Sequence, residues 1–380
     1  MIHIIDKHNC CGCHACVSVC AHHCITMQAD EEGFLYPVVD KETCTDCGLC
    51  EKVCPVINQG SPRKPLKVYA AKNNDEEIRK QSSSGGIFTL LAEAVIKDGG
   101  IVFGAKFDKD WNVVHDWTDT IEGIADFRGS KYVQSTIGNT YSEAREFLKQ
   151  GRKVLFSGTP CQIAGLKKFL RKEYDNLLTV DVVCHGVPSP KVWQRYLKDL
   201  NSNNSAITDV CFRSKKRGWK NYSYLIQSQK SVLFDDYAFK SDYLQAFSLN
   251  LSIRPSCYIC PSKNLKSESD ITLADCWGIE KIAEDDNVGF STILLNTDKA
   301  LLFCQDLDVC SKDIDYSFVV DNNKSISYSA HEPYCRKLFW NLFPNEGLSA
   351  AQIIKRRLTN NIFFRIYNKI RTHIICIKNR

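Results

Sequence analysis

The chain has 380 residues, enough for two or three domains, and its 44% hydrophobic and 24% charged residues exclude an intrinsically disordered protein. Its twenty cysteines do not indicate an exported disulfide scaffold, because no basic start with an apolar segment and no membrane-spanning apolar run is present, so we expect a cytoplasmic protein. Residues 355–380 hold eight basic residues and no acidic one, so the net charge of +5 leaves −3 for the rest, and we expect no nucleic-acid binding.

The first 54 residues hold ten cysteines, and eight of these form two runs with one spacing. The spacing is CxxCxxCxxxC, and it is typical of bacterial ferredoxins in which three cysteines of one run and the last of the other hold each [4Fe–4S] cluster. The first cluster is then expected on Cys10, Cys13, Cys16 and Cys54. The second cluster is expected on Cys44, Cys47, Cys50 and Cys20.

Structural zinc is the alternative for these cysteines, since zinc sites also use CxxC pairs. A zinc site needs only four ligands, however, and two complete runs of identical spacing favour iron–sulfur clusters. Cys11 and Cys24 fall outside the spacing, and we expect them to be buried thiols near the clusters.

A linker and a new domain should follow the cysteine runs. Residues 58–65 are rich in turn-forming residues and lack an apolar period, so a second domain is expected to begin near Lys67. The patterns predict strands at 67–72, 100–107 and 111–117 and a helix over 87–95. Two units of strand, polar turn and helix then cover 153–172 and 177–200. Strands dominate from Thr208 to about Thr297, and the region from His331 is expected to be helical.

Alternating strands and helices indicate an α/β fold with ligand sites on the loops at the carboxyl ends of the strands. Four further cysteines lie in loops rich in Gly, Pro and Ser: Cys161, Cys184, Cys257 and Cys260. They are either ordinary small residues or the ligands of a third metal site. The sequences SSSGG and SGTP, each next to a predicted helix, are either anion-binding loops or plain turns.

Seven motifs follow the cysteine-rich region in a fixed order: SSSGGIF, GSKYVQS, FSGTPCQIAGL, DVVCHGVPSP, FRSKKRGW, RPSCYICPSK and SDITLADCWGI. With this set, the chain from about Asn9 to Thr297 resembles the beta subunit of coenzyme F420 hydrogenase/dehydrogenase. The resemblance implies a mixed α/β (α+β) protein with three parts. These are a ferredoxin-like domain over 1–60, an FAD-binding and [4Fe–4S]-binding α/β domain over 66–330, and a helical basic extension over 331–380.

The resemblance also implies which residues hold the cofactors of the larger domain. A third [4Fe–4S] cluster would fall to Cys161, Cys184, Cys257 and Cys260. FAD would lie against Ser84, Gly85, Gly86, Lys131, Tyr132, Ser157, Gly158, Thr159, Pro160 and Gln162. Lys131 is hypothesised to place positive charge near the flavin. Cys276 is expected to be a bystander, because four cysteines already complete a cluster.

The expected function is that of an iron–sulfur, FAD-dependent oxidoreductase that exchanges electrons with coenzyme F420 or another small organic substrate. Some similar chains occur near polysaccharide biosynthesis enzymes, so a role in polysaccharide biosynthesis is also among the expectations. The alternatives are an electron-transfer adaptor or an iron–sulfur scaffold that serves a partner enzyme. A redox partner protein and a hetero-oligomer are expected from the resemblance to a subunit.

The basic tail shows apolar residues at spacings of three or four, from Ile354 to Ile377. This pattern predicts a basic amphipathic helix. Such a helix can lie peripherally on an anionic membrane surface, here the inner face of the membrane, or pack against the protein's own core or an acidic partner.

Overall fold

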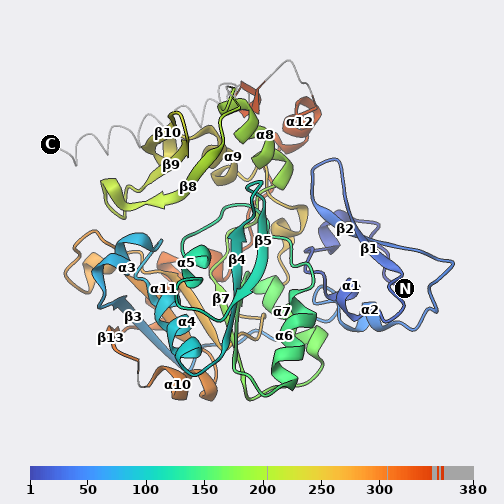
Figure 1. Cartoon of the computed structure of the whole chain (residues 1–380), viewed down its shortest axis with the longest axis horizontal. Helices are drawn as coiled ribbons and strands as arrows, with labels where there is room; N and C mark the ends of the chain where they lie inside the picture. The colour runs from blue at the N-terminus through green and yellow to red at the C-terminus, as the bar shows by residue number, and fades with distance from the viewer. Residues whose placement is uncertain (203, 306, 345–348, 351, 355–380) are drawn as a thin grey trace.

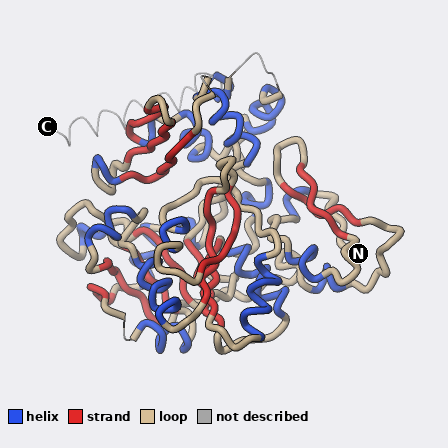
Figure 2. Tube along the Cα trace, in the orientation of Figure 1, coloured by secondary structure: helices blue, strands red, loops and turns tan. Residues whose placement is uncertain are grey.

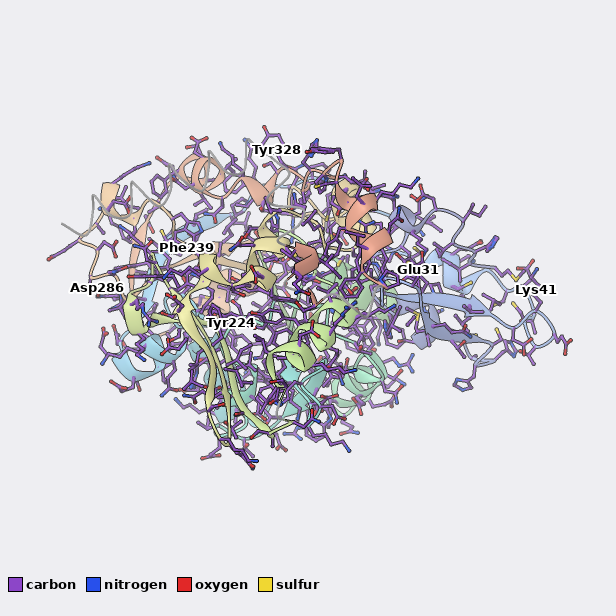
Figure 3. The ribbon with its side chains drawn as sticks, turned by 90° about the horizontal axis from the view of Figure 1, so that it is seen from above. Glu31, Lys41, Tyr224, Phe239, Asp286 and Tyr328 are labelled. Carbon is purple, nitrogen blue, oxygen red and sulfur yellow. The ribbon has the colours of Figure 1, made fainter. Side chains whose placement is uncertain are left out.

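The computed structural model describes residues 1–202, 204–305, 307–344, 349–350 and 352–354. Residues 1–60, here called the head, project from one side of the larger main domain (Figures 1 and 3). Glu31 lies toward the main domain and Lys41 at the far tip of the head. The head contains α1 (Ala15–Val19), β1 (Ile25–Ala29), β2 (Leu35–Val39) and α2 (Leu49–Lys52), with β1 and β2 forming an antiparallel hairpin.

The two cysteine runs of the head share a backbone conformation as well as a spacing. Gly12 and His14 in the first run have positive φ angles of 68° and 63°. The equivalent residues of the second run, Asp46 and Gly48, have φ angles of 51° and 73°. In each run the second of these residues caps the helix that follows, α1 or α2. The repeated sequence is therefore also a repeated turn.

The main domain is built on an eight-stranded mixed sheet with the order β13-β3-β12-β11-β7-β6-β4-β5. Strands β4, β6, β7 and β11 form a parallel group in the middle of the sheet. Strand β5 at one edge, and β12, β3 and β13 at the other, each pair antiparallel. The strand bounds are β3 (Lys67–Asn73), β4 (Ile101–Phe107), β5 (Val113–Thr118), β6 (Val154–Gly158), β7 (Leu177–Val182), β11 (Ile271–Asp275), β12 (Ser291–Leu295) and β13 (Val309–Asp313).

Helices cover both faces of this sheet (Figure 2). Successive side chains of a strand point to opposite faces. Phe103 and Phe156 accordingly pack in the core on the α6–α7 side, whereas Val102 and Leu155 pack with α4. The helices of the main domain around this sheet are α3 (Glu76–Gln81), α4 (Ile87–Lys97), α5 (Ile124–Phe127), α6 (Thr140–Lys149), α7 (Pro160–Leu170), α10 (Asp298–Cys304) and α11 (Tyr316–Asn322). The head packs on the α6–α7 side, with Cys11, Cys13 and Ala15 in the same core cluster.

A smaller three-stranded sheet forms a second layer with its own core. It has the order β10-β9-β8, with β8 (Ile207–Ser214), β9 (Ser223–Ser228) and β10 (Val232–Tyr237). Helices α8 (Pro190–Leu200), α9 (Asp242–Ser248) and α12 (Arg336–Leu342) contribute to the same core as this sheet. Trp193 and Phe212 are buried in this core together with Phe339 and Ile353, so residues on both sides of position 330 share it.

The predicted strands and helices up to residue 200 are confirmed, and β3 begins at Lys67 as expected. The later region is less purely stranded than expected, because α9 and short 3-10 helices such as η4 (Pro255–Ile259) and η5 (Ile279–Lys281) separate its strands. Within the described residues, no helix has both the length and the apolar character to cross a membrane. The predicted amphipathic tail helix lies almost entirely in residues 355–380, outside the described residues.

Candidate functional site

The structure gathers the cysteines predicted for the second head cluster around one small pocket. Cys20, Cys44, Cys47 and Cys50 line it, together with Cys24. The backbone N–H of Ile2 donates to Sγ of Cys50 over 3.2 Å, the kind of amide–sulfur bond that surrounds cluster ligands. Cys24 is buried, with its Sγ 3.4 Å from that of Cys20, so it lies beside the predicted ligands as expected.

The cysteines predicted for the first head cluster are close neighbours deeper in the molecule. Burial, and then the charges of Cys10 and Cys54, raise the pKa of Cys16 to about 12. Cys54, from the second run, is thus a neighbour of Cys10 and Cys16 from the first run, and the exchange of the last ligand between the runs stays a prediction. Cys47 is exposed, whereas Cys13 and Cys16 are buried, so the second set is at the outer end of the head.

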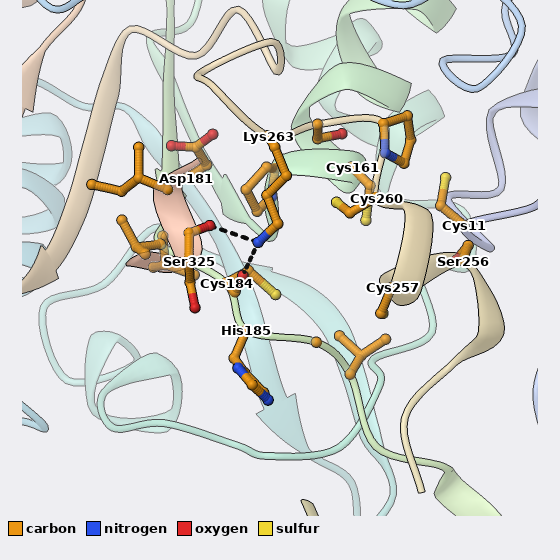
Figure 4. A pocket seen from close by; sticks show the side chains of 18 of the residues that line it. Cys11, Cys161, Asp181, Cys184, His185, Ser256, Cys257, Cys260, Lys263 and Ser325 are labelled. Atoms are coloured by element: carbon orange, nitrogen blue, oxygen red, sulfur yellow. Dashed lines mark hydrogen bonds between the residues drawn. The ribbon is translucent and has the colours of Figure 1, made fainter. Parts of the chain in front are cut away.

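A third group of cysteines lines a cavity in the main domain: Cys161, Cys184, Cys257 and Cys260 (Figure 4). Cys161 is in the first turn of α7, directly after β6, and Cys184 follows β7. Strands β6 and β7 are adjacent and parallel, so the loops at their carboxyl ends meet. Cys257 and Cys260 come from η4 and the residue that ends it. Cys11 of the head also lines this cavity, which the sequence did not predict.

Lys263 connects two loops at the edge of this cysteine cavity. Its Nζ donates to the backbone oxygens of Cys184 over 2.8 Å and of Ser325 over 2.6 Å (Figure 4). Burial raises the pKa of the Cys184 thiol to about 12. In the described part of the chain, no three His, Cys, Asp or Glu side chains are grouped as ligands of a single metal ion. A [4Fe–4S] cluster differs in that four irons each take one cysteine.

A larger cavity of about 670 Å³ lies at the carboxyl ends of the same strands. This volume is within the range of small-molecule and cofactor sites. Most of the residues predicted to bind FAD line it: Ser84, Gly86, Lys131, Tyr132, Ser157, Gly158, Thr159 and Gln162. Gly85 and Pro160 do not. Gly85 is buried against Ala71 and Ser291, and Pro160 lines the cysteine cavity.

Two of the predicted FAD contacts make strong bonds within the protein. Oε1 of Gln162 accepts from the backbone N–H and the hydroxyl of Thr159, over 2.9 and 3.0 Å, in a capping box at the start of α7. Nζ of Lys131 donates to the backbone oxygens of Asp126 and Arg128, over 2.7 and 2.9 Å. Both side chains thus hold the cavity wall, and the hypothesis that Lys131 stabilises reduced flavin stays a prediction.

The larger cavity also contains His115, which the sequence did not point to, and three residues of the motifs that carry the family resemblance: Arg213, Asp275 and Trp277. His115, from β5, is buried, and its Nε2 donates to the backbone oxygen of Ser157 over 3.1 Å. Burial lowers the pKa of His115 to about 4, so the ring is neutral, and its Nδ1 has no protein partner. Arg213 pairs with Asp275 over 2.5 Å beside Trp277. His115 lies in a strand without a repeated spacing, so no local pattern could have identified it.

One short segment, residues 182–187, lines both cavities. It contains Cys184 and His185 and directly follows β7. Ser325 also lines both cavities, so the cysteine cavity and the larger cavity are neighbours.

Asp270 and Cys276, in the same part of the main domain, lie among residues that hold the fold together. Asp270 accepts hydrogen bonds from the backbone N–H and the hydroxyl of Thr179, which joins β7 to β11. Cys276 is buried in a separate core cluster with Trp219 and Ile279. Neither residue lines the cysteine cavity.

Comparisons with known proteins identify the family of the chain. Residues 9–58 match the model of the 4Fe-4S dicluster domain. Residues 68–140 and 151–310 match the models of the N-terminal and C-terminal parts of the coenzyme F420 hydrogenase/dehydrogenase beta subunit. No curated protein matches the chain. One similar solved structure is a xenon derivative of the F420-reducing [NiFe] hydrogenase complex from Methanosarcina barkeri. It is 19% identical, with a TM-score of 0.45 and 71% of this chain and 97% of that chain covered. Together, the family matches show that the chain belongs to the coenzyme F420 hydrogenase/dehydrogenase beta subunit family and carries an N-terminal 4Fe-4S dicluster domain.

Proposed function

We propose that this iron–sulfur electron-transfer subunit is an FAD-dependent oxidoreductase with a third [4Fe–4S] cluster. The third cluster would be held by Cys161, Cys184, Cys257 and Cys260, and FAD would occupy the larger cavity. Electrons would pass between the head and this cavity, to or from coenzyme F420 or another small organic substrate.

The observation that carries the proposal is the order of the sites through the molecule. The head supplies Cys11 to the cysteine cavity, and residues 182–187 are shared by the cysteine cavity and the larger cavity. Two sites that share lining residues are neighbours, and electrons can therefore pass from one to the other.

The chemistry of the cysteine cavity fits a cluster. Four thiols from three segments surround one space, and thiolate sulfur is the ligand that iron–sulfur clusters use. Two cations, Arg254 and Lys263, line the same cavity, where they offset the negative charge of four thiolates.

The larger cavity fits a flavin nucleotide in charge as well as in size. Arg128, Arg213 and Lys324 line it together with Asp275, an excess of cations suited to a diphosphate. The unpaired Nδ1 of His115 is a buried acceptor in its wall. A bound FAD would convert between the single electrons of clusters and two-electron hydride transfer. The protein's own part is to bind and orient that group: the capping box of Thr159 and Gln162 fixes one wall, and Lys131 fixes another.

Anaerobic purification followed by cofactor analysis tests the proposal. The full chain should contain FAD and about twelve irons, the content of three four-iron clusters. The Cys184→Ala variant should lose about four irons and keep the rest. The matched control is Cys276→Ala, a buried cysteine outside the cavity, which should keep all of its iron. A chain with about eight irons and no flavin would contradict the proposal and favour the adaptor or scaffold alternative.

The substrate and the partner follow from a second set of measurements. Coenzyme F420 and the substrates of polysaccharide biosynthesis are the candidate small molecules, and the rate at which each re-oxidises the reduced flavin distinguishes them. The family is named for a subunit, so we propose a hetero-oligomer. Sedimentation of the chain with its electron donor tests for that complex.

For the basic tail the proposal rests on the sequence, and two interpretations stay open: contact with an anionic membrane surface and docking on protein. A variant that ends at Ile354 keeps the core residues Ile353 and Ile354 and removes the tail. If the tail contacts membranes, the full chain should sediment with anionic vesicles at low salt and the variant should not. Equal behaviour of the two would exclude the membrane interpretation.

A further inference from the structure

Arg254 joins the main domain to the first cysteine run of the head. It directly precedes η4, the element that contains Cys257. The guanidinium is fully buried, and its Nε donates to the backbone oxygen of Cys10 over 2.6 Å. Its Nη2 donates to the backbone oxygen of Leu35 over 2.9 Å and lies 3.6 Å from Sγ of Cys10. Its Nη1 donates to Oε1 of Gln134 over 3.0 Å.

None of these partners is a carboxylate, which is unusual for a fully buried arginine. A buried cation is costly unless negative charge lies close to it. The side chains around Arg254 are instead aromatic and cysteine: the guanidinium lies 4.2 Å from the ring centre of Tyr36, and its Nη2 lies 3.6 Å from Sγ of Cys10. Cys257 follows on η4, and its backbone N–H donates to the backbone oxygen of Arg254. The negative charge that suits this position is that of cysteine thiolates bound to metal.

Three consecutive residues of the head meet this point. Cys10 is a predicted ligand of the first cluster and bonds to Arg254. Cys11 turns the other way, into the cysteine cavity beside Cys161 (Figure 4). Gly12 has a φ of +68°, and a Cβ there would lie 2.7 Å from Nη1 of Arg254. Only a glycine at this position therefore leaves room for the guanidinium.

We propose that Arg254 and Cys11 form the electron-transfer junction between the first head cluster and the third cluster. The inference rests on the proposed function, since it needs a cluster in the cysteine cavity. Arg254 is a positioning residue that also favours the more negative, reduced state of the neighbouring cluster. Cys11 contacts both Cys13, a predicted ligand of the first cluster, and Cys161, and it keeps water out of the space between them. One electron leaves one side and enters the other, and no bond is made or broken.

The test uses the full chain and the variant Arg254→Gln, with Arg254→Lys as the conservative change. Arg336→Gln is the matched control. Arg336 is also buried and also joins the head to the main domain, through Glu32, but its bonds reach the hairpin rather than the cysteine run. The readouts are iron content, an EPR-monitored redox titration of the first cluster, and the kcat and KM for an artificial electron donor to the head.

We expect Arg254→Gln to keep its iron and to lower the ratio of reduced to oxidised first cluster by about tenfold or more at a fixed potential, because a unit charge at this range acts strongly. Its kcat should fall while KM for the donor stays the same. Arg254→Lys should recover the ratio in part, and Arg336→Gln should leave it unchanged. If Arg254→Gln and Arg336→Gln give the same ratio, Arg254 only docks the head and the inference is wrong. If Arg254→Gln does not fold, the ratio in Arg254→Lys decides.

Cys11→Ala tests the second half of the junction, with Cys24→Ala as its control, since both are buried cysteines beside a predicted cluster. Cys11→Ala should keep all iron and slow the transfer to the larger cavity, whereas Cys24→Ala should not. Loss of iron in Cys11→Ala would make Cys11 a ligand and overturn its assigned role. An unmodified chain with about eight irons would instead disprove the third cluster itself, so the two failures can be told apart.

Discussion

The head and the main domain assemble their cysteines in opposite ways. In the head, two contiguous runs of identical spacing and identical turns bring the predicted ligands together within 54 residues. In the main domain, four cysteines spread over 100 positions meet only because β6 and β7 are parallel neighbours and η4 folds back onto their ends. A local pattern can specify the first kind of site, whereas the second depends on the whole sheet.

The comparison predicts that the outer end of the head can be disabled without affecting the main domain. Cys47→Ala should remove about four irons and abolish electron exchange with an external donor, because Cys47 is the exposed member of the outer set. Flavin and the remaining iron should stay. Iron analysis and donor kinetics check this, with the exposed Cys310→Ala as the control. Unchanged iron in Cys47→Ala would contradict the head assignment.

The boundary between the two regions should be the next most sensitive place. Arg336 makes a buried two-pronged pair with Glu32, and each side chain is 10% exposed. Arg336→Gln leaves the carboxylate of Glu32 buried without its partner, which should cost about 3–5 kcal/mol.

Thermal unfolding followed by cluster absorbance measures that loss. The double variant with Glu32→Gln should lose less than the sum of the two single variants, because they remove one interaction. Additive losses would show that the pair contributes nothing of its own.

A smaller effect is expected where the head lies against α7. A Cβ at Gly165 would lie 2.8 Å from Cβ of Cys13, a contact that requires one region to move. Gly165→Ala should therefore cost about 1–3 kcal/mol through overpacking, although alanine is the better helix former. Lys168→Ala on the same helix is the control for helix propensity. A Gly165→Ala variant as stable as this control would mean that the two regions can separate slightly without cost.

The sequence predicted much of this molecule wherever the signal is local. The ferredoxin spacing, the strand–turn–helix units at 153–172 and 177–200, and the start of the main domain at Lys67 all correspond to elements of the structure. The position of Cys11 in the cysteine cavity and the bonds of Arg254 join residues more than 100 positions apart, so no spacing contains them. His115 was missed because the sequence alone does not distinguish it from any other buried polar residue in a strand. Only the structure shows that it lines the larger cavity and that its Nδ1 has no partner.

The repeated turns of the head have a consequence for how the two cysteine runs can change. They are copies of one unit, but their surroundings differ: Gly12 lies under Arg254, while its counterpart Asp46 is exposed. The second run therefore has room for an aspartate at a positive φ, whereas the first run has room only for a glycine. A head with its two runs exchanged would place the Cβ of an aspartate where only 2.7 Å separates a Cβ from Nη1 of Arg254, and it could not dock in the same way. The contact with the main domain therefore makes the two runs unequal, although they share one spacing and one kind of turn: the first run lies at the inner end of the head and the second at the outer end.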